Sequence, residues 1–330
     1  MKLRSVTAAL VALPFIFGCG EASDSQAGEP GLFEASAMDP MGGPEAFLDG
    51  PELWLAPLDY SEVGVPRLGE GRNVTDRAGY DNQPRFLRDG SILYTRGVGE
   101  RTDIWRYDPA LDRHTSVTAT PDQSEYSATP TPDGGFSAIV VEPDSLQRLW
   151  RFDLDGSAGA PLFEDVAPVG YHAWLDDKRI GMFVLGQPAT LQLAPAGAAG
   201  PAKEVDRDIG RSLNRMPGRD AISYPVARGR MWEVRALVND DGGEFTAPLA
   251  RIAAQDHAWT PEGRILFGSG HRLMAIGPVA IPDSASGSEG LQTDAAYVVG
   301  TLPDTSMVIS RLAVSDDGRS IVLVVDRPQD

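Results

Sequence analysis

The chain has 330 residues, of which 42% are apolar and 23% charged, a composition typical of a globular protein with a substantial core. Its 36 glycines and 26 prolines favour many turns over long helices. Asp and Glu number 47 against 29 Lys and Arg, and the net charge of −18 argues against a nucleic-acid partner. The composition also excludes a disordered chain, a coiled coil, a protein with several membrane spans and a disulfide-stapled scaffold.

Residues 1–18 have the features of a secretory signal. Two basic residues precede an apolar stretch, residues 6–17, that is too short to span a bilayer as a helix. The stretch leads to Cys19, the only cysteine of the chain, and so resembles the lipobox of bacterial lipoproteins. The resemblance implies cleavage before Cys19, lipidation of its thiol with palmitate, and, because Gly20 follows, anchoring to the outer membrane of the cell envelope. A conventional signal peptide with an incidental cysteine is the alternative.

Residues 19–51 are interpreted as the lipidated cysteine followed by a flexible tether. They are rich in Gly, Ala, Ser, Pro and acidic residues and show no sustained hydrophobic period. Such a segment buries too little apolar surface to offset the entropy lost on ordering. The tether would hold residues 52–330, as one domain, away from the membrane, either in the periplasm or at the cell surface.

A repeat dominates the chain from residue 52 onward. Six segments place a turn before an apolar run, and their equivalent turn residues are Asp89, Asp133, Asp177, Gly218, Glu262 and Asp317. The steps between these residues are 44, 44, 41, 44 and 55, and a period of 40–50 residues with β character indicates propeller blades. The long last step predicts an inserted mobile loop over residues 278–294 of the fifth blade.

Each turn is followed by an apolar strand and then by a strand that in several repeats carries tryptophan. The strands after the turns, such as residues 138–141 and 321–325, are apolar on both faces, as expected for sheets packed between neighbours. All six tryptophans occupy repeat positions, which favours packing between blades over a cofactor site: Trp54, Trp105, Trp150, Trp174, Trp232 and Trp259.

The strand count predicts how the ring closes. The sixth repeat ends after two strands, whereas two strands without a preceding turn lie in residues 52–71. Pairing of residues 52–71 with residues 310–327 completes an all-β, six-bladed propeller of four-stranded blades and leaves no free sheet edge at the junction.

The repeat resembles the TolB-type six-bladed β-propeller. The resemblance is carried by Pro-Asp-Gly at 132–134 and Ser-Asp-Asp-Gly at 315–318, and by the Ile-Trp or Leu-Trp strands that follow such turns. It covers roughly residues 52–327 and is limited to the propeller. It implies a fold and leaves the function open.

Candidate site residues cluster on the predicted innermost strands. His172 and His257 occupy the same repeat position, five residues before the turn residue, and Tyr171 and Asp256 precede them. In a six-bladed propeller these positions line a central channel, where two imidazoles can bind a metal or act as acid and base. Side chains at comparable places complete a polar ring: Gln83, Tyr126, Arg211 and Arg311. Channel-facing residues that bond only to water and loops are the alternative, and no cofactor is predicted.

Two functions remain open from the sequence. The first is an envelope-anchored, monomeric propeller that binds a protein or glycan of the cell envelope across its funnel face and catalyses no reaction. The second is a propeller hydrolase or lyase that uses the two channel histidines with or without a metal. Neither a phosphate-binding glycine loop nor a Gly-x-Ser-x-Gly nucleophile elbow is present.

Overall fold

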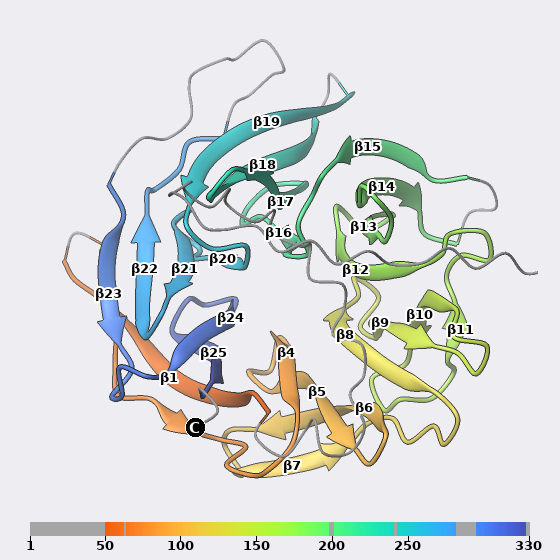
Figure 1. The fold of residues 1–330 in the computed structure, drawn as a ribbon, viewed down its shortest axis with the longest axis horizontal. Helices are drawn as coiled ribbons and strands as arrows, with labels where there is room; N and C mark the ends of the chain where they lie inside the picture. The colour runs from red at the N-terminus through yellow and green to blue at the C-terminus, as the bar shows by residue number, and fades with distance from the viewer. Residues whose placement is uncertain (1–49, 63, 198–200, 241–242, 282–294, 328–330) are drawn as a thin grey trace, which may run out of the picture. The chain divides into compact units, whose positions relative to one another are not determined.

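Apolar strands alternate with tight turns to form six antiparallel sheets in the computed structural model, which describes residues 50–62, 64–197, 201–240, 243–281 and 295–327. The sheets stand in a ring, as Figure 1 shows, so the protein is a six-bladed β-propeller. The predicted signal, Cys19, the tether and most of the predicted 278–294 loop lie outside the described residues. No helix long and apolar enough to cross a membrane occurs in the described part of the chain.

Five blades are each built from four consecutive strands, the first innermost and the last outermost. Blade one contains β4 (Asp81–Phe86), β5 (Ile92–Val98), β6 (Arg101–Asp108) and β7 (Arg113–Ser116). Blade two contains β8 (Ser124–Pro130), β9 (Phe136–Val141), β10 (Gln147–Phe152) and β11 (Ala160–Pro161). Blade three contains β12 (Val169–Trp174), β13 (Arg179–Val184), β14 (Thr190–Pro195) and β15 (Lys203–Arg207).

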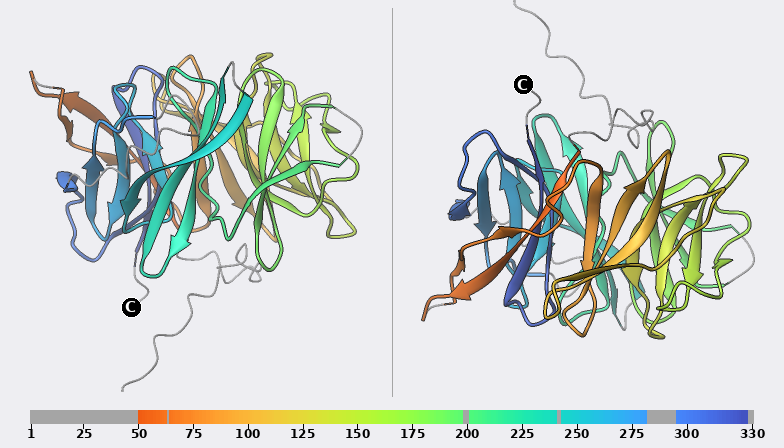
Figure 2. Two further views of the ribbon diagram at one scale, coloured as in Figure 1. Left: turned by 90° about the horizontal axis from the view of Figure 1, so that it is seen from above. Right: turned by 90° about the horizontal axis from the view of Figure 1, so that it is seen from below.

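The next two blades repeat the arrangement, and the predicted turns and strand order are confirmed throughout. Blade four contains β16 (Asn214–Arg215), β17 (Ala221–Arg228), β18 (Met231–Asp240) and β19 (Gly243–Ile252). Blade five contains β20 (His257–Trp259), β21 (Ile265–Ser269), β22 (Arg272–Ile276) and β23 (Tyr297–Thr301). The side views in Figure 2 show the strands running between the two faces of the ring.

The sixth blade joins the two ends of the propeller domain. It contains β24 (Val308–Val314), β25 (Ser320–Asp326), β1 (Glu52–Tyr60) and β2 (Pro66–Leu68), and β3 (Arg72–Asn73) also pairs with β1. Strands β1 and β25 are antiparallel, with Leu53 opposite Val324 and Leu55 opposite Val322. The predicted closure of residues 52–71 on residues 310–327 is therefore confirmed.

The core lies between the blades. Each of six buried clusters draws side chains from neighbouring blades, as where Leu93 and Ile104 of blade one pack with Ala138 and Val140 of blade two. This arrangement explains why the second strands are apolar on both faces, since each sheet has a neighbour on either side. All six tryptophans belong to these clusters or pack against them, which confirms their role in packing.

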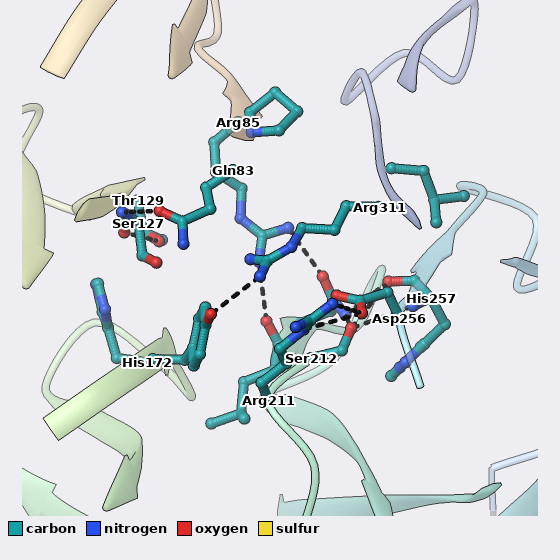
Figure 3. Close-up of a pocket in the computed structure, with 15 residues that line it drawn as sticks. Gln83, Arg85, Ser127, Thr129, His172, Arg211, Ser212, Asp256, His257 and Arg311 are labelled. Atoms are coloured by element: carbon teal, nitrogen blue, oxygen red, sulfur yellow. Dashed lines mark hydrogen bonds and ion pairs between the residues drawn. The ribbon is translucent and has the colours of Figure 1, made fainter. Parts of the chain in front are cut away.

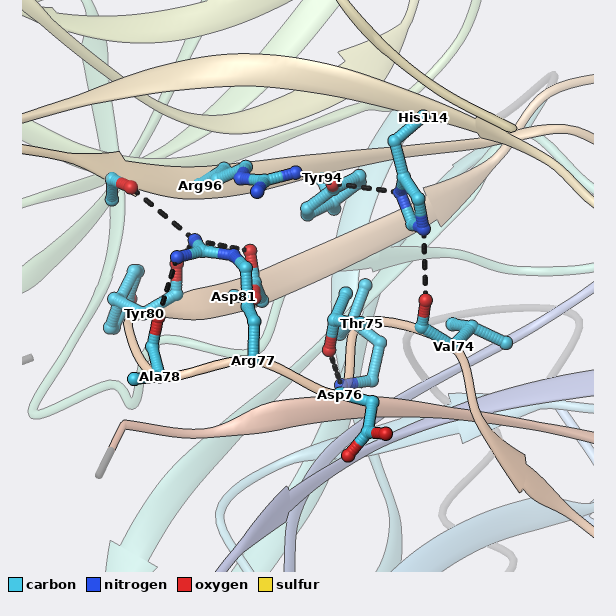
Figure 4. Close-up of polar contacts among 12 residues, drawn as sticks. Val74, Thr75, Asp76, Arg77, Ala78, Tyr80, Asp81, Tyr94, Arg96 and His114 are labelled. Carbon is cyan, nitrogen blue, oxygen red and sulfur yellow. Dashed lines mark hydrogen bonds and ion pairs between the residues drawn. The ribbon is translucent and has the colours of Figure 1, made fainter. Parts of the chain in front are cut away.

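A polar network fixes the connection from the closing blade to blade one (Figure 4). The guanidinium group of Arg77 donates to the backbone oxygens of Ala78, Tyr80 and Gly97 and forms a 2.9 Å ion pair with the fully buried Asp81. His114, on β7, contacts the backbone oxygen of Val74 at 2.9 Å and is half-buried. A buried carboxylate with this pairing holds the junction in one geometry.

Truncation of Leu53 tests the closing strand. Leu53 is fully buried on β1, so Leu53→Ala is expected to lower the free energy of unfolding by about 2–5 kcal/mol through lost burial and the cavity left behind. Leu111→Ala, at a residue that is 61% exposed, is the control and should change it by less than about 0.5 kcal/mol. Urea denaturation at pH 7 measures both. Equal, small effects would contradict a closure that depends on β1.

Candidate functional site

The innermost strands β4, β8, β12, β16, β20 and β24 surround the axis of the ring, and their channel-facing positions follow a simple rule. The residue six positions before each turn residue lines one central cavity: Gln83, Ser127, Tyr171, Ser212, Asp256 and Arg311. All six are polar. The repeat therefore builds a polar throat, because equivalent backbone positions in a ring point to the same axis.

The throat is narrow and opens into a wider funnel. The throat cavity has a volume of about 40 Å³, room for only a few water-sized groups, whereas the funnel has a volume of about 570 Å³. Arg85, His172, Leu213 and Asn214 line both spaces and mark their junction. The funnel wall beyond them is mixed: several prolines and the largely buried Trp174, Met216 and Trp259 alternate with polar side chains such as Arg88 and Arg215.

Two channel positions of blades one and two have strained backbones. Gln83 and Ser127 have φ values of 55°, in the left-handed region that side-chain-bearing residues seldom occupy. Both lie at register shifts in the innermost strands, between Asn82 and Arg85 and between Tyr126 and Thr129. The Gln83 side-chain oxygen accepts hydrogen bonds from Ser127 N at 2.8 Å and Thr95 Oγ1 at 2.9 Å. These bonds stabilise the bulges that present the two residues to the channel.

The two histidines are held by a repeated serine–tryptophan pair of contacts. The Oγ of Ser137, in the preceding blade, lies 2.7 Å from His172 Nε2 and accepts from Trp174 Nε1 at 3.1 Å. In blades four and five, the Oγ of Ser223 contacts His257 Nε2 at 2.8 Å and accepts from Trp259 Nε1 at 2.8 Å. The same device thus joins two different pairs of blades.

Both imidazoles are neutral at pH 7. His172 and His257 are only 2% and 1% exposed. Burial lowers the pKa of His172 to about 3, and the nearby charge of Arg85 acts in the same direction. Burial lowers the pKa of His257 to about 4, although the Asp256 carboxylate opposes the shift. A base with so low a pKa is a poor proton acceptor near neutral pH, and Nε2 of each ring already contacts a serine.

Arginine side chains dominate the charge of the throat (Figure 3). Arg211 Nε and Nη2 donate to Asp256 Oδ2 at 3.1 and 3.0 Å. Arg311 Nη2 donates to the Tyr171 hydroxyl at 3.0 Å, and its guanidinium carbon lies 5.3 Å from the centre of that ring. The three arginines Arg85, Arg211 and Arg311 outnumber the one carboxylate among the cavity-lining residues.

Comparison with known proteins identifies the architecture. No protein-family model and no curated protein sequence matches the chain. TolB from Acinetobacter baumannii is 12% identical with a TM-score of 0.53, over 89% of this chain and 67% of that one. A putative TolB from Agrobacterium tumefaciens is 13% identical with a TM-score of 0.60, over 85% and 100%. The chain has a TolB-like six-bladed propeller fold.

A further solved structure extends the same likeness. A gluconolactonase from Xanthomonas campestris is 11% identical with a TM-score of 0.55, over 82% of this chain and 95% of that one. At these identities the likeness establishes the fold alone, so it assigns neither a binding role nor a reaction to this TolB-like propeller.

The TolB-like propeller brings most of the expected site residues together. Gln83, Tyr171, His172, Arg211, Asp256, His257 and Arg311 line the throat. Tyr126 instead belongs to a buried cluster with Ile139 and Leu149. Among the described residues, no three His, Cys, Asp or Glu side chains gather in a metal-binding group. Arg85 was missed, because it follows the bulge at Gln83 and a bulge interrupts the alternation from which a channel-facing position could be predicted.

The acid sensitivity of folding tests the buried state of the histidines. Because the folded pKa values lie below the unfolded value of about 6.5, stability is fully present above pH 6.5 and is lost as the pH falls. Between pH 7 and 5 each histidine should contribute a loss on the order of 2 kcal/mol. His172→Gln and His257→Gln should each remove that share of the loss, as measured by urea denaturation at both pH values.

His271→Gln is the matched control for this series, because His271 is only partly buried and lies in the turn between β21 and β22. Glu125, whose pKa is raised to about 7 by burial, titrates in the opposite sense but is common to all variants. If both channel-histidine variants lost as much unfolding free energy between pH 7 and 5 as wild type does, the low pKa values of the two rings would be contradicted.

Proposed function

We propose that the protein is a lipoprotein of the cell envelope whose TolB-like propeller is a binding module. In this proposal Cys19 carries the lipid anchor at the outer membrane, and the propeller engages a protein or glycan of the envelope through its funnel face. The single observation that supports it is the funnel itself: a cavity of about 570 Å³ with a wall of mixed polar and apolar side chains, leading to a polar throat.

The rigidity of the walls supports binding as the main task. The funnel rim is formed by turns between first and second strands. Arg88 and Asp316 lie in such turns, and Arg215 ends strand β16 just before one. Loops displayed on a stiff scaffold are suited to recognition, because little conformational entropy is lost when a partner docks. Charged side chains at a rim with a partly apolar interior match the general anatomy of protein interfaces.

The alternative, a hydrolase or lyase that uses His172 and His257, has less support. Both rings are buried, both contact a serine that also accepts from a tryptophan, and both have pKa values of about 4 or below. These contacts account for the residues as joints between blades. An acid–base pair would need a pKa nearer the working pH and an open face toward substrate.

Capture of a partner from envelope extracts tests the binding proposal. Arg88→Glu and Arg215→Glu reverse charges at the funnel mouth, and Arg113→Glu on the outermost strand β7 is the matched control. We expect wild type and the control to capture the same protein or glycan, and the mouth variants to retain about tenfold less. Quantitative mass spectrometry measures the bound material. Equal recovery by all four proteins would count against the funnel face as the binding surface.

The anchor is tested separately with Cys19→Ala. Lipidation requires the thiol of Cys19, the sole cysteine, so the variant should no longer incorporate labelled palmitate and should leave the membrane fraction. Membrane fractionation with Ser25→Ala as control measures the change. Membrane retention and labelling of Cys19→Ala would overturn the lipoprotein assignment while leaving the propeller unaffected.

A further inference from the structure

The throat of the propeller contains positive charge that the protein itself does not neutralise. Its lining includes Arg85, Arg211 and Arg311 but only one carboxylate, that of Asp256, and both histidines there are neutral at pH 7. Asp256 is engaged by Arg211 through two contacts of 3.0 and 3.1 Å. Two guanidinium charges are therefore left over.

Arg85 and Arg311 have only neutral partners among the described residues. Arg85 donates to Asn214 Oδ1 at 2.9 Å and to the backbone oxygen of Leu213 at 3.0 Å. Arg311 donates to the Tyr171 hydroxyl at 3.0 Å. In the part of the chain that the structure covers, neither arginine forms an ion pair.

The two charges are close enough to affect each other. Burial lowers the pKa of Arg85 to about 10, and the positive charge of Arg311 lowers it further, against the effect of Asp256. Figure 3 shows the side chains of Arg85 and Arg311 converging in the centre of the cavity. The pKa of Arg311 is raised despite burial, because Tyr171, Asp256 and Tyr80 favour its charged form. The unfavourable charge is therefore that of Arg85. An anion between the two guanidinium groups would stabilise it.

Elsewhere in this acidic chain, several partly buried arginines have carboxylate partners, although among the described residues Arg264 is held by backbone oxygens and the Tyr297 hydroxyl alone. Arg148 contacts Glu142 and Glu164, and Arg179 contacts Asp176 and Glu244. With 47 acidic side chains available against 29 basic ones, a missing counterion in the throat stands out. A site for an external anion requires fixed hydrogen-bond donors and positive charge without a carboxylate partner, and the throat has both.

We propose that the throat binds a carboxylate group, held between the guanidinium groups of Arg85 and Arg311, on a chain that enters through the funnel. This inference rests on the proposed binding function and names the chemistry of its ligand. The cavity of about 40 Å³ accommodates the head group alone, and the funnel of about 570 Å³, whose wall includes the small exposed parts of Trp174 and Trp259, receives the remainder of the ligand.

Charge favours a carboxylate over a phosphate. Planar guanidinium groups present paired N–H donors that match two oxygens of either anion, so the geometry of the arginines does not decide between them. The Tyr171 hydroxyl accepts from Arg311 and has its own proton to donate to a bound oxygen. Asp256 stands in the same cavity and repels a second negative charge on the ligand.

The test uses the full-length protein in a non-ionic detergent and follows binding by calorimetry and by tryptophan fluorescence. The probes are sodium acetate, sodium phosphate, and the blocked peptides acetyl-Gly-Gly-Asp-Gly-Gly-amide and its Asn counterpart, all against sodium chloride at equal ionic strength. We expect acetate and the Asp peptide to bind, the Asp peptide more tightly because it also fills the funnel. The Asn peptide should bind at least about tenfold more weakly than the Asp peptide.

Three variants assign the site. Arg85→Gln and Arg311→Gln should weaken binding of acetate and of the Asp peptide at least about tenfold, and Arg113→Gln, on the outermost strand, should leave it unchanged. Without ligand, Arg85→Gln should have a melting temperature equal to or above that of wild type, because burial and Arg311 disfavour its charge, whereas Arg311→Gln should lower it modestly through the lost contacts with Tyr171. This comparison separates loss of the site from loss of the fold.

Several outcomes would overturn the inference. These are acetate behaving like chloride, phosphate binding more tightly than acetate, or undiminished binding in both throat variants. If acetate bound but the Asp peptide bound no more tightly than the Asn peptide, the carboxylate site would be supported for small free carboxylates. The proposal that the carboxylate is carried on a chain entering through the funnel would then be overturned. The proposed binding function has a separate test. It fails if the funnel-mouth variants capture partners as well as wild type does, even where acetate still binds in the throat.

Discussion

The antiparallel pairing of β1 with β25 is the interaction on which the rest of the structure depends. Six pairs of opposed residues, from Glu52–Val325 to Pro57–Ser320, join the two ends of the propeller domain. A propeller blade buries both of its faces, so an open ring would expose an apolar face on each terminal blade. Closure removes those faces and holds the six innermost strands around one axis. The throat exists only because that axis is fixed.

Once the axis is fixed, the repeat decides which side chains meet there. Residues six positions before the turns supply the polar lining of the throat. Residues five positions before them are buried, and all except Ala128 also border the throat: Pro84, Ala128, His172, Leu213, His257 and Leu312. Four of these six are apolar, and the two histidines replace apolar packing with a bond to serine from the neighbouring blade. A period of two along a strand separates the two sets.

This alternation explains how far the sequence could predict the molecule. The turns, the tryptophan strands and the closure repeat often enough to define the blades, and all were predicted correctly. The orientation of single side chains was not, because a one-residue change of register moves a residue to the other face. Tyr126 fell on the buried side for that reason. The bulges at Gln83 and Ser127 depend on the contact between these two blades, which no local pattern encodes.

The contrast between the acidic chain and its basic throat has a consequence for selectivity. A net charge of −18 repels anions at a distance, so a free anion gains little by approaching the propeller. At physiological ionic strength this field decays over about 8 Å, whereas Arg85 and Arg311 act at contact distance inside the throat. A ligand must therefore gain other contacts before its carboxylate reaches the throat. The funnel supplies them, with Arg88 and Arg215 at its mouth and the small exposed parts of Trp174 and Trp259 in its wall, so a carboxylate borne on a chain that fills the funnel meets both requirements at once.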